Sequence, residues 1–167
     1  MRHNNAAHVA LSRLLMTPHP EMDVPQHRLI TIYTDGACSG NPGVGAWAYR
    51  IEWPDGQVEE KAEATRDTTN NREELKAIRE ALLKVRDTLS TATDWRAIVY
   101  TDSLGAINWL NHTWKRNKNL DLFPTIDPLL DSRISLTHVR GHSGVIGNER
   151  VDRLAVAAVE EWVRRNR

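Results

Sequence analysis

Two short strings in the chain end alike, each with an aspartate that follows a run of β-branched and aromatic residues. They are residues 32–35, which end at Asp35, and residues 99–102, which end at Asp102. Such runs favour buried strands, and ligands of open α/β sheets bind at the carboxyl ends of strands. If the two strands are parallel neighbours, both carboxylates meet at one edge. They then either raise each other's pKa or hold a divalent cation.

Two further acids lie near the starts of predicted helices. Glu74 shares a helix face with Ile78, and Asp152 shares one with Ala155, so both carboxylates are predicted to border the buried side. Each acid alone also has a structural explanation, since acids complement the start of a helix and Asp is common at turns. Together, the four carboxylates indicate an oxygen-ligand site for Mg²⁺ or Mn²⁺. Two such ions could clamp an in-line phosphoryl displacement.

A histidine lies in a glycine-rich loop shortly before the second of these helices. His142 follows Gly141 and is followed by Ser143 and Gly144. Glycines allow backbone conformations that other residues avoid, and a histidine can exchange protons near neutral pH. A surface histidine often has no role, so His142 is a candidate for proton transfer only beside a catalytic site.

The elements that must position these residues follow from hydrophobic periodicity and turn signals. A helix is predicted to start at Thr69 or Asn70, with Glu73 completing a capping box, and Asn148 is predicted to cap the last helix. Strands are predicted at residues 29–34, 44–53, 57–64, 95–101 and 134–139, and helices at 70–89, 103–110, 124–130 and 148–165. Three strands in a meander, followed by alternating helices and strands, predict an α/β fold with a mixed sheet.

Composition places the chain among globular proteins of one domain. Its 167 residues carry 22 basic and 22 acidic side chains, so bulk charge does not predict a nucleic-acid partner. The single cysteine, Cys38, fits a reducing, cytoplasmic location, and no apolar run approaches the ~20 residues of a membrane helix. Residues 1–27 lack aromatic residues and are expected to form a flexible extension before a domain at 28–167. A targeting role for the extension stays open.

Four motifs in order resemble ribonuclease H of type 1. They are TDGACSGNPG at 34–43, TNNREEL at 69–75, TDS at 101–103, and VRGHSG at 139–144 together with NERVD at 148–152. The resemblance implies the ribonuclease H-like fold, a mixed five-stranded sheet of three antiparallel strands plus parallel strands, flanked by helices. It also implies an endonuclease that cleaves the RNA strand of RNA/DNA hybrids and leaves 5′-phosphate and 3′-hydroxyl ends.

The resemblance also assigns roles to residues. It makes the metal ligands Asp35, Glu74, Asp102 and Asp152, with two Mg²⁺ ions in the substrate complex and Mn²⁺ expected to substitute. It gives His142 a part in proton transfer or product departure. It implies that seven residues contact the hybrid, namely Cys38, Gly40, Asn41, Thr69, Asn70, Asn71 and Trp109. Amides and backbone groups of this kind can recognise 2′-hydroxyls in a shallow minor groove. Alternatively, Asn70 and Asn71 only cap a helix, and Trp109 only fills the core.

The chain departs from the family pattern in its substrate-binding segments. Many relatives have a long basic protrusion, but here only the short basic segment at residues 115–119 stands in its place. In addition, Asp67 replaces a common arginine, and Leu104 replaces a residue that is often polar. Fewer cations predict weaker binding with a shallower salt dependence. We expect a monomer without a membrane partner. The alternatives are a DNA-processing nuclease of the same fold or a non-catalytic module that binds hybrids.

Overall fold

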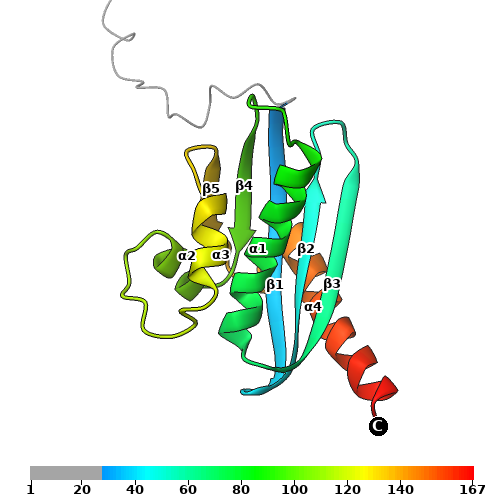
Figure 1. The fold of residues 1–167 in the computed structure, drawn as a ribbon. Helices are drawn as coiled ribbons and strands as arrows, with labels where there is room; N and C mark the ends of the chain where they lie inside the picture. Colours follow the sequence, from blue (N-terminus) through cyan, green and yellow to red (C-terminus); the bar gives the residue numbers. More distant parts are fainter. Residues whose placement is uncertain (1–27) are drawn as a thin grey trace, which may run out of the picture.

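The computed structural model describes residues 28–167, which form a five-stranded mixed sheet between helices (Figure 1). The sheet order is β3-β2-β1-β4-β5, with strands β1 (Leu29–Gly40), β2 (Gly43–Glu52), β3 (Val58–Thr68), β4 (Arg96–Thr101) and β5 (Ile134–His138). β1, β2 and β3 are antiparallel, whereas β4 runs parallel to β1, and β5 runs parallel to β4. The predicted fold class is therefore confirmed. The predicted extension, residues 1–27, lies outside the described residues.

Helices cover the two faces of the sheet. They are α1 (Asn70–Thr88), α2 (Leu104–Leu110), α3 (Phe123–Ile126), the 3₁₀ turn η3 (Asp127–Leu129) and α4 (Ile146–Arg165). In Figure 1, α1 crosses the front of the sheet and α4 lies behind it, where it contacts β1, β2 and β3. Among the described residues, no helix is both long enough and apolar enough to span a membrane.

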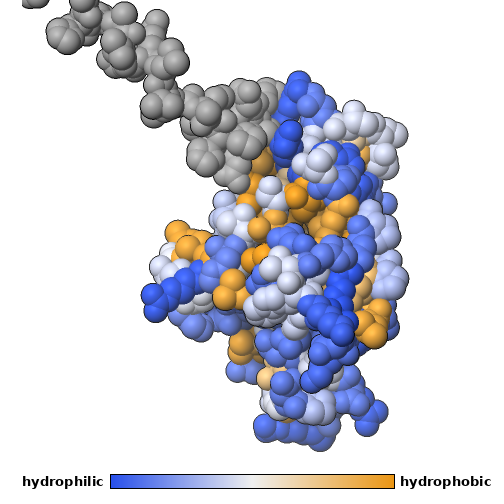
Figure 2. Space-filling view, turned by 90° about the vertical axis from the view of Figure 1, so that its left-hand side faces the viewer, coloured by the Kyte–Doolittle hydropathy of each residue, from blue (hydrophilic) through white to orange (hydrophobic). Residues whose placement is uncertain are grey.

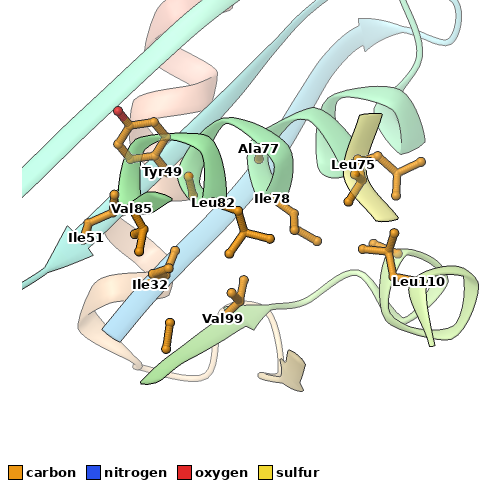
Figure 3. Close-up of a cluster of buried hydrophobic side chains, with 14 of the residues drawn as sticks. Ile32, Tyr49, Ile51, Leu75, Ala77, Ile78, Leu82, Val85, Val99 and Leu110 are labelled. Carbon is orange, nitrogen blue, oxygen red and sulfur yellow. The ribbon is translucent and has the colours of Figure 1, made fainter. Parts of the chain in front are cut away.

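The main core lies between α1 and the central strands. The buried stripe of α1 consists of Leu75, Ile78, Leu82 and Val85, as the periodicity predicted, and these side chains face those of β1 and β4 (Figure 3). Burying one such side chain stabilises a fold by about 1.5–3 kcal/mol. This packing fixes α1 against the carboxyl ends of the two strands that carry the aspartates.

α4 packs on the opposite face through small residues. Ala48, Val151 and Ala155 form a second buried cluster there. At Gly147 the helix comes so close to β1 that a Cβ atom would lie 2.3 Å from Cε2 of Tyr33. Only glycine allows this approach without displacing the helix or the ring, so Gly147 sets how closely α4 sits against the sheet.

One predicted capping contact and one predicted helix start differ from the structure. α1 is capped by Thr69, one of the two predicted caps, but the Thr69 hydroxyl accepts from the Arg72 amide, so the capping box with Glu73 is wrong. Glu73 is instead fully buried and bonded to β3. The second difference concerns α4, which begins at Ile146 after Val145, without a side-chain cap. Asn148 is therefore a buried residue inside the helix rather than its cap.

The first strand is also longer than expected. The sequence predicts its end at Thr34, but β1 continues to Gly40, because the segment after Asp35 pairs with β2 in an antiparallel hairpin. Gly40 adopts a positive φ of 84° at the turn, which glycine tolerates best. The hairpin extends beyond the aspartate and forms one side of the region described next.

Candidate active site

Asp35 and Asp102, the aspartates of the two similar sequence motifs, lie side by side at one edge of the sheet. β1 and β4 are parallel neighbours, and their register pairs Tyr33 with Tyr100. Asp35 and Asp102 each follow two residues later, so the two carboxylates emerge at the same level. The predicted convergence of the two aspartates is therefore present in the structure, although Asp35 lies within β1 rather than at its end.

Glu74 joins them from α1. Carboxylate oxygens of Asp35, Glu74 and Asp102 all lie within 4.8 Å of one another. The start of α1 comes close to β1 at Gly36, where a Cβ atom would lie 2.4 Å from the amide nitrogen of Glu74. The Gly36 amide also favours the charged forms of both carboxyls, since it lowers the pKa of Asp35 and of Glu74 against the stronger raising effect of burial. Glycine at this position thus permits the helix to deliver its acid to the strand.

The fourth acid, Asp152, approaches from the opposite side of the sheet. It lies in the second turn of α4 rather than the first, since the helix starts earlier than predicted. Its side chain is within hydrogen-bonding reach of Asp35, although it is not part of the compact group of three. The four predicted acids therefore come together from four separate elements, β1, α1, β4 and α4.

The electrostatics of this cluster favour a bound cation. Burial, together with the charges of Asp102 and Asp152, raises the pKa of Asp35 to about 8. Burial and the charges of Asp35 and Asp102 raise the pKa of Glu74 well above its ordinary value. Glu74 is 4% exposed, and its Oε2 atom has no hydrogen-bond partner among the described residues. A convergent set of carboxylate oxygens with an unpartnered, buried member fits a hard divalent cation such as Mg²⁺ or Mn²⁺.

His142 lies at the rim of this cluster. A Cβ atom on the preceding residue, Gly141, would lie 2.8 Å from Oδ2 of Asp102, so the loop touches the acid directly. His142 itself is exposed and has a positive φ of 54°. The loop is closed by hydrogen bonds from Ser143 to the Arg140 carbonyl and from the Gly144 amide to Glu149. The histidine is thus held in an anchored loop beside the acids and is open to solvent.

The predicted minor-groove residues form a surface beside the acids. The Asn41 side chain, in the β1–β2 turn, accepts a hydrogen bond of 3.2 Å from the Asn70 amide. The side chain of Asn70 donates to Oε1 of Glu74 at 3.5 Å, which links this surface to the acids. Because Thr69 caps the helix, the alternative that Asn70 and Asn71 only cap it is wrong. Both asparagines are exposed.

Cys38 and Gly40 lie on the same hairpin arm. The Cys38 thiol donates to the Thr68 carbonyl at 3.5 Å, which holds β1 close to the residue before the cap. Burial, followed by the charge of Glu73, raises the pKa of this thiol. Gly40 is exposed at the turn. The structure therefore brings the hairpin and the start of α1 into one continuous surface.

Trp109 belongs to a separate part of the surface, on α2. It is half-buried, packs against the main core and meets Trp114 edge to face with ring centroids 6.3 Å apart. Its partner Trp114 and Leu104, the first residue of α2, are about half exposed. Figure 2, which views the molecule from the side of β5 and α2, shows apolar patches separated by hydrophilic residues. Trp109 thus contributes to the core and also borders an apolar surface.

Sequence reasoning missed one residue of this region. Glu73 was expected only to complete a capping box, but it is fully buried next to Glu74 and is bonded to Thr68 and Lys76. The signal available in the sequence was Lys76 three residues later, on the same helix face.

The fold and the acids define a class, namely α/β proteins in which carboxylates from several elements gather at one edge of a mixed sheet. The RNase H family matches this chain over residues 27–160. The ribonuclease H of Syntrophomonas wolfei is 42% identical over 146 residues, which cover 78% of this chain and 96% of the relative. That of Thermosynechococcus vestitus is 43% identical over 138 residues, which cover 74% of this chain and 84% of the relative. The chain therefore belongs to the ribonuclease H family.

Solved structures agree with this assignment. RNase H1 from the halophilic archaeon Halobacterium salinarum is 28% identical with a TM-score of 0.64, and the match covers 80% of this chain and 98% of that protein. LC11-RNase H1, solved in complex with an RNA/DNA hybrid, shares the fold with a TM-score of 0.71 at 24% identity, and the match covers 80% of this chain and 99% of that protein.

Proposed function

We propose that this ribonuclease H is an endonuclease that hydrolyses the RNA strand of RNA/DNA hybrids and leaves 5′-phosphate and 3′-hydroxyl ends. The observation that carries the proposal is the group of three carboxylates, Asp35, Glu74 and Asp102, whose oxygens lie within 4.8 Å of one another. Membership of the ribonuclease H family supplies the substrate class.

The cofactor we propose is Mg²⁺, with two ions in the substrate complex and Mn²⁺ able to substitute. The residues that would hold the ions are Asp35, Glu74, Asp102 and Asp152. When bound, such ions lower the pKa of an attacking water and stabilise the leaving oxygen. Asp35 must lose its proton to serve as a ligand, and its pKa of about 8 means that cation binding near neutral pH releases a proton. Glu74 offers the unpartnered Oε2 atom to the same ions.

His142 is proposed to move a proton at the product side or to assist product departure. Its support is its place in the chain, directly after the glycine that contacts Asp102. Because the side chain is exposed, it can exchange protons with solvent without a conformational change of the core.

The hybrid is proposed to lie across the surface formed by the hairpin and the start of α1. Amide and backbone groups there can reach 2′-hydroxyls in the minor groove, which separates RNA from DNA without reading bases. The contacts would come from Cys38, Gly40, Asn41, Asn70 and Asn71 on the minor groove, with Thr69 on a DNA phosphate and Trp109 on a DNA sugar. The hydrogen bond from Asn70 to Glu74 gives substrate binding a direct link to the acids.

We further propose that residues 28–167 form the catalytic domain and act as a monomer in the cytoplasm. A single cysteine, which leaves no second thiol for an internal disulfide, is consistent with a reducing compartment. Cleavage by a protein made of residues 28–167, its elution volume in size-exclusion chromatography and cell fractionation test the three statements.

The decisive experiment is a cleavage assay on one labelled 20-mer offered as RNA/DNA, RNA/RNA, DNA/DNA and single-stranded RNA. It compares Mg²⁺ with a chelator, and the intact protein with Asp102→Asn. The matched control is Asp87→Asn, which changes an exposed acid in the last turn of α1. We expect metal-dependent cleavage of the hybrid alone, abolished by Asp102→Asn and retained in the control. Cleavage of DNA/DNA would point to a DNA-processing nuclease. Binding without cleavage would point to a non-catalytic module.

A further inference from the structure

Glu73 is a fully buried carboxylate that lies one residue before Glu74. Its Oε1 atom accepts hydrogen bonds of 2.7 Å from the Thr68 hydroxyl and 2.7 Å from the Lys76 ammonium. Its Oε2 atom accepts a 3.3 Å hydrogen bond from the Thr65 hydroxyl, to which Lys76 also donates at 3.1 Å. A buried charge is costly unless it is paired and hydrogen-bonded. We call these four residues the Glu73 network.

The Glu73 network joins the start of α1 to the end of β3. Glu73 and Lys76 belong to the helix, whereas Thr65 and Thr68 belong to the strand. Two glycines enclose Glu73 from the other strands. A Cβ atom on Gly45 of β2 would lie 3.0 Å from the Cγ atom of Glu73, and one on Gly36 of β1 would lie 3.0 Å from its Cβ atom. The network therefore fixes the rotation and height of the first helical turns against three strands.

Glu74, in contrast, has few contacts that could orient it. Its Oε1 atom accepts one long hydrogen bond, at 3.5 Å, from Asn70, and its Oε2 atom has no partner among the described residues. Its direction must follow from the placement of the helix backbone, because consecutive helical residues point in fixed relative directions. Whatever holds Glu73 in place thus also sets where the Glu74 carboxylate points.

We propose that Glu73 is a positioning residue, which acts through the Glu73 network to aim Glu74 at Asp35 and Asp102 and thereby sets the affinity of the site for divalent cations. The proposal extends the proposed function, since it concerns the same metal site. It differs from a purely stabilising role, because a buried ion pair is a weak source of stability. Replacing both partners by apolar residues is often neutral or stabilising.

The test separates metal affinity from stability. The probe is Mn²⁺ alone, titrated by calorimetry into the folded, full-length protein without substrate. The variants are Glu73→Gln, which leaves Lys76 without its charged partner, and Glu73→Met combined with Lys76→Met, which removes both charges at similar volume. The matched control is Val85→Ala, a fully buried position of α1 outside the network, which lowers stability through a cavity.

We expect both Glu73 variants to bind Mn²⁺ about tenfold more weakly, at the lower end of the range for residues that orient metal ligands. The double variant should keep a thermal midpoint close to that of the parent, and Val85→Ala should lower the midpoint but keep the Mn²⁺ affinity. In hybrid cleavage, the Mg²⁺ concentration for half-maximal rate should rise with the loss of affinity, and the rate at saturating Mg²⁺ should change little.

Three outcomes would overturn the inference. They are unchanged Mn²⁺ affinity in the double variant, an equal loss of affinity in Val85→Ala, and no Mn²⁺ binding by the parent protein. The proposed function fails separately, if the parent binds Mn²⁺ but leaves hybrids intact. In that case the calorimetry still decides whether Glu73 positions the metal site.

Discussion

Replacing Asp35 by Asn should stabilise the metal-free protein at neutral pH. The pKa of Asp35 is raised to about 8 from an ordinary 3.8, mainly by burial and then by Asp102 and Asp152. At pH 7 the folded state still holds a proton that an unfolded chain has released. The ordinary pKa lies about three units below pH 7, and each unit is worth about 1.4 kcal/mol, so the stability gained by the substitution has a ceiling near 4 kcal/mol. An amide also loses solvation on burial, so we expect a gain of about 2 kcal/mol, or roughly 6 °C in the thermal midpoint.

The sign of the pH dependence follows from the raised pKa. Asp35 contributes its full stability below about pH 4, where the folded and unfolded states both hold the proton, and this contribution is lost as the pH rises through about 8. Protonated Asp and Asn are similar in shape and charge. The two proteins should therefore be equally stable near pH 4, and the advantage of Asp35→Asn should grow toward pH 8 and then level off.

The assay is thermal unfolding in the presence of a chelator from pH 4 to pH 9, with the exposed-site variant Asp67→Asn as the control. The control should follow the parent at every pH. Adding Mg²⁺ should raise the midpoint of the parent, since a ligand that binds only the folded state stabilises it, and should raise that of Asp35→Asn much less. An advantage that does not vary with pH, or a variant that is less stable at pH 8, would refute the electrostatic reasoning.

Three further predictions concern packing, a surface ion pair and salt. Gly147→Ala should lower the free energy of unfolding in urea by about 1–3 kcal/mol, because its Cβ atom would overlap the Tyr33 ring; an unchanged midpoint would mean that α4 can shift freely. Asp121→Asn, which breaks a bidentate pair with Arg72, should cost less than about 1 kcal/mol because Asp121 is 64% exposed, and a loss several times larger would contradict this. The affinity for hybrid should fall with rising salt concentration less steeply than in relatives with a long basic protrusion, because Arg116 is already held in an ion pair with Asp127. An equally steep slope in a binding titration would disprove this.

The four acids could be predicted because each has a local signature. Asp35 and Asp102 end strand-like runs, and Glu74 and Asp152 border apolar helix faces, so type and spacing mark each as a candidate, and only the set of four indicates a metal site. Their convergence depends on β1 and β4 being parallel neighbours. Sequence spacing leaves that pairing open, because it depends on contacts between segments far apart in the chain, and the resemblance to a family supplied it.

Glu73 and the start of α4 could not be predicted for related reasons. The local pattern placed Glu73 in a capping box, but the residues that bury it belong to β1, β2 and β3. α4 begins at Ile146, and the residue before it, Val145, offers no capping side chain, so the start of the helix has no local signature. The close packing of Gly147 against Tyr33 holds this end of the helix, and a single sequence does not reveal that contact.

The distribution of the acids over four elements also matters while the chain is being made. β1, α1 and β4 leave the ribosome first, and Asp152 arrives only with α4. A nascent chain therefore lacks the complete set of carboxylates until α4 has packed against the sheet. On the proposed mechanism, which uses all four carboxylates, cleavage of hybrids therefore begins only after the last helix of the chain has folded.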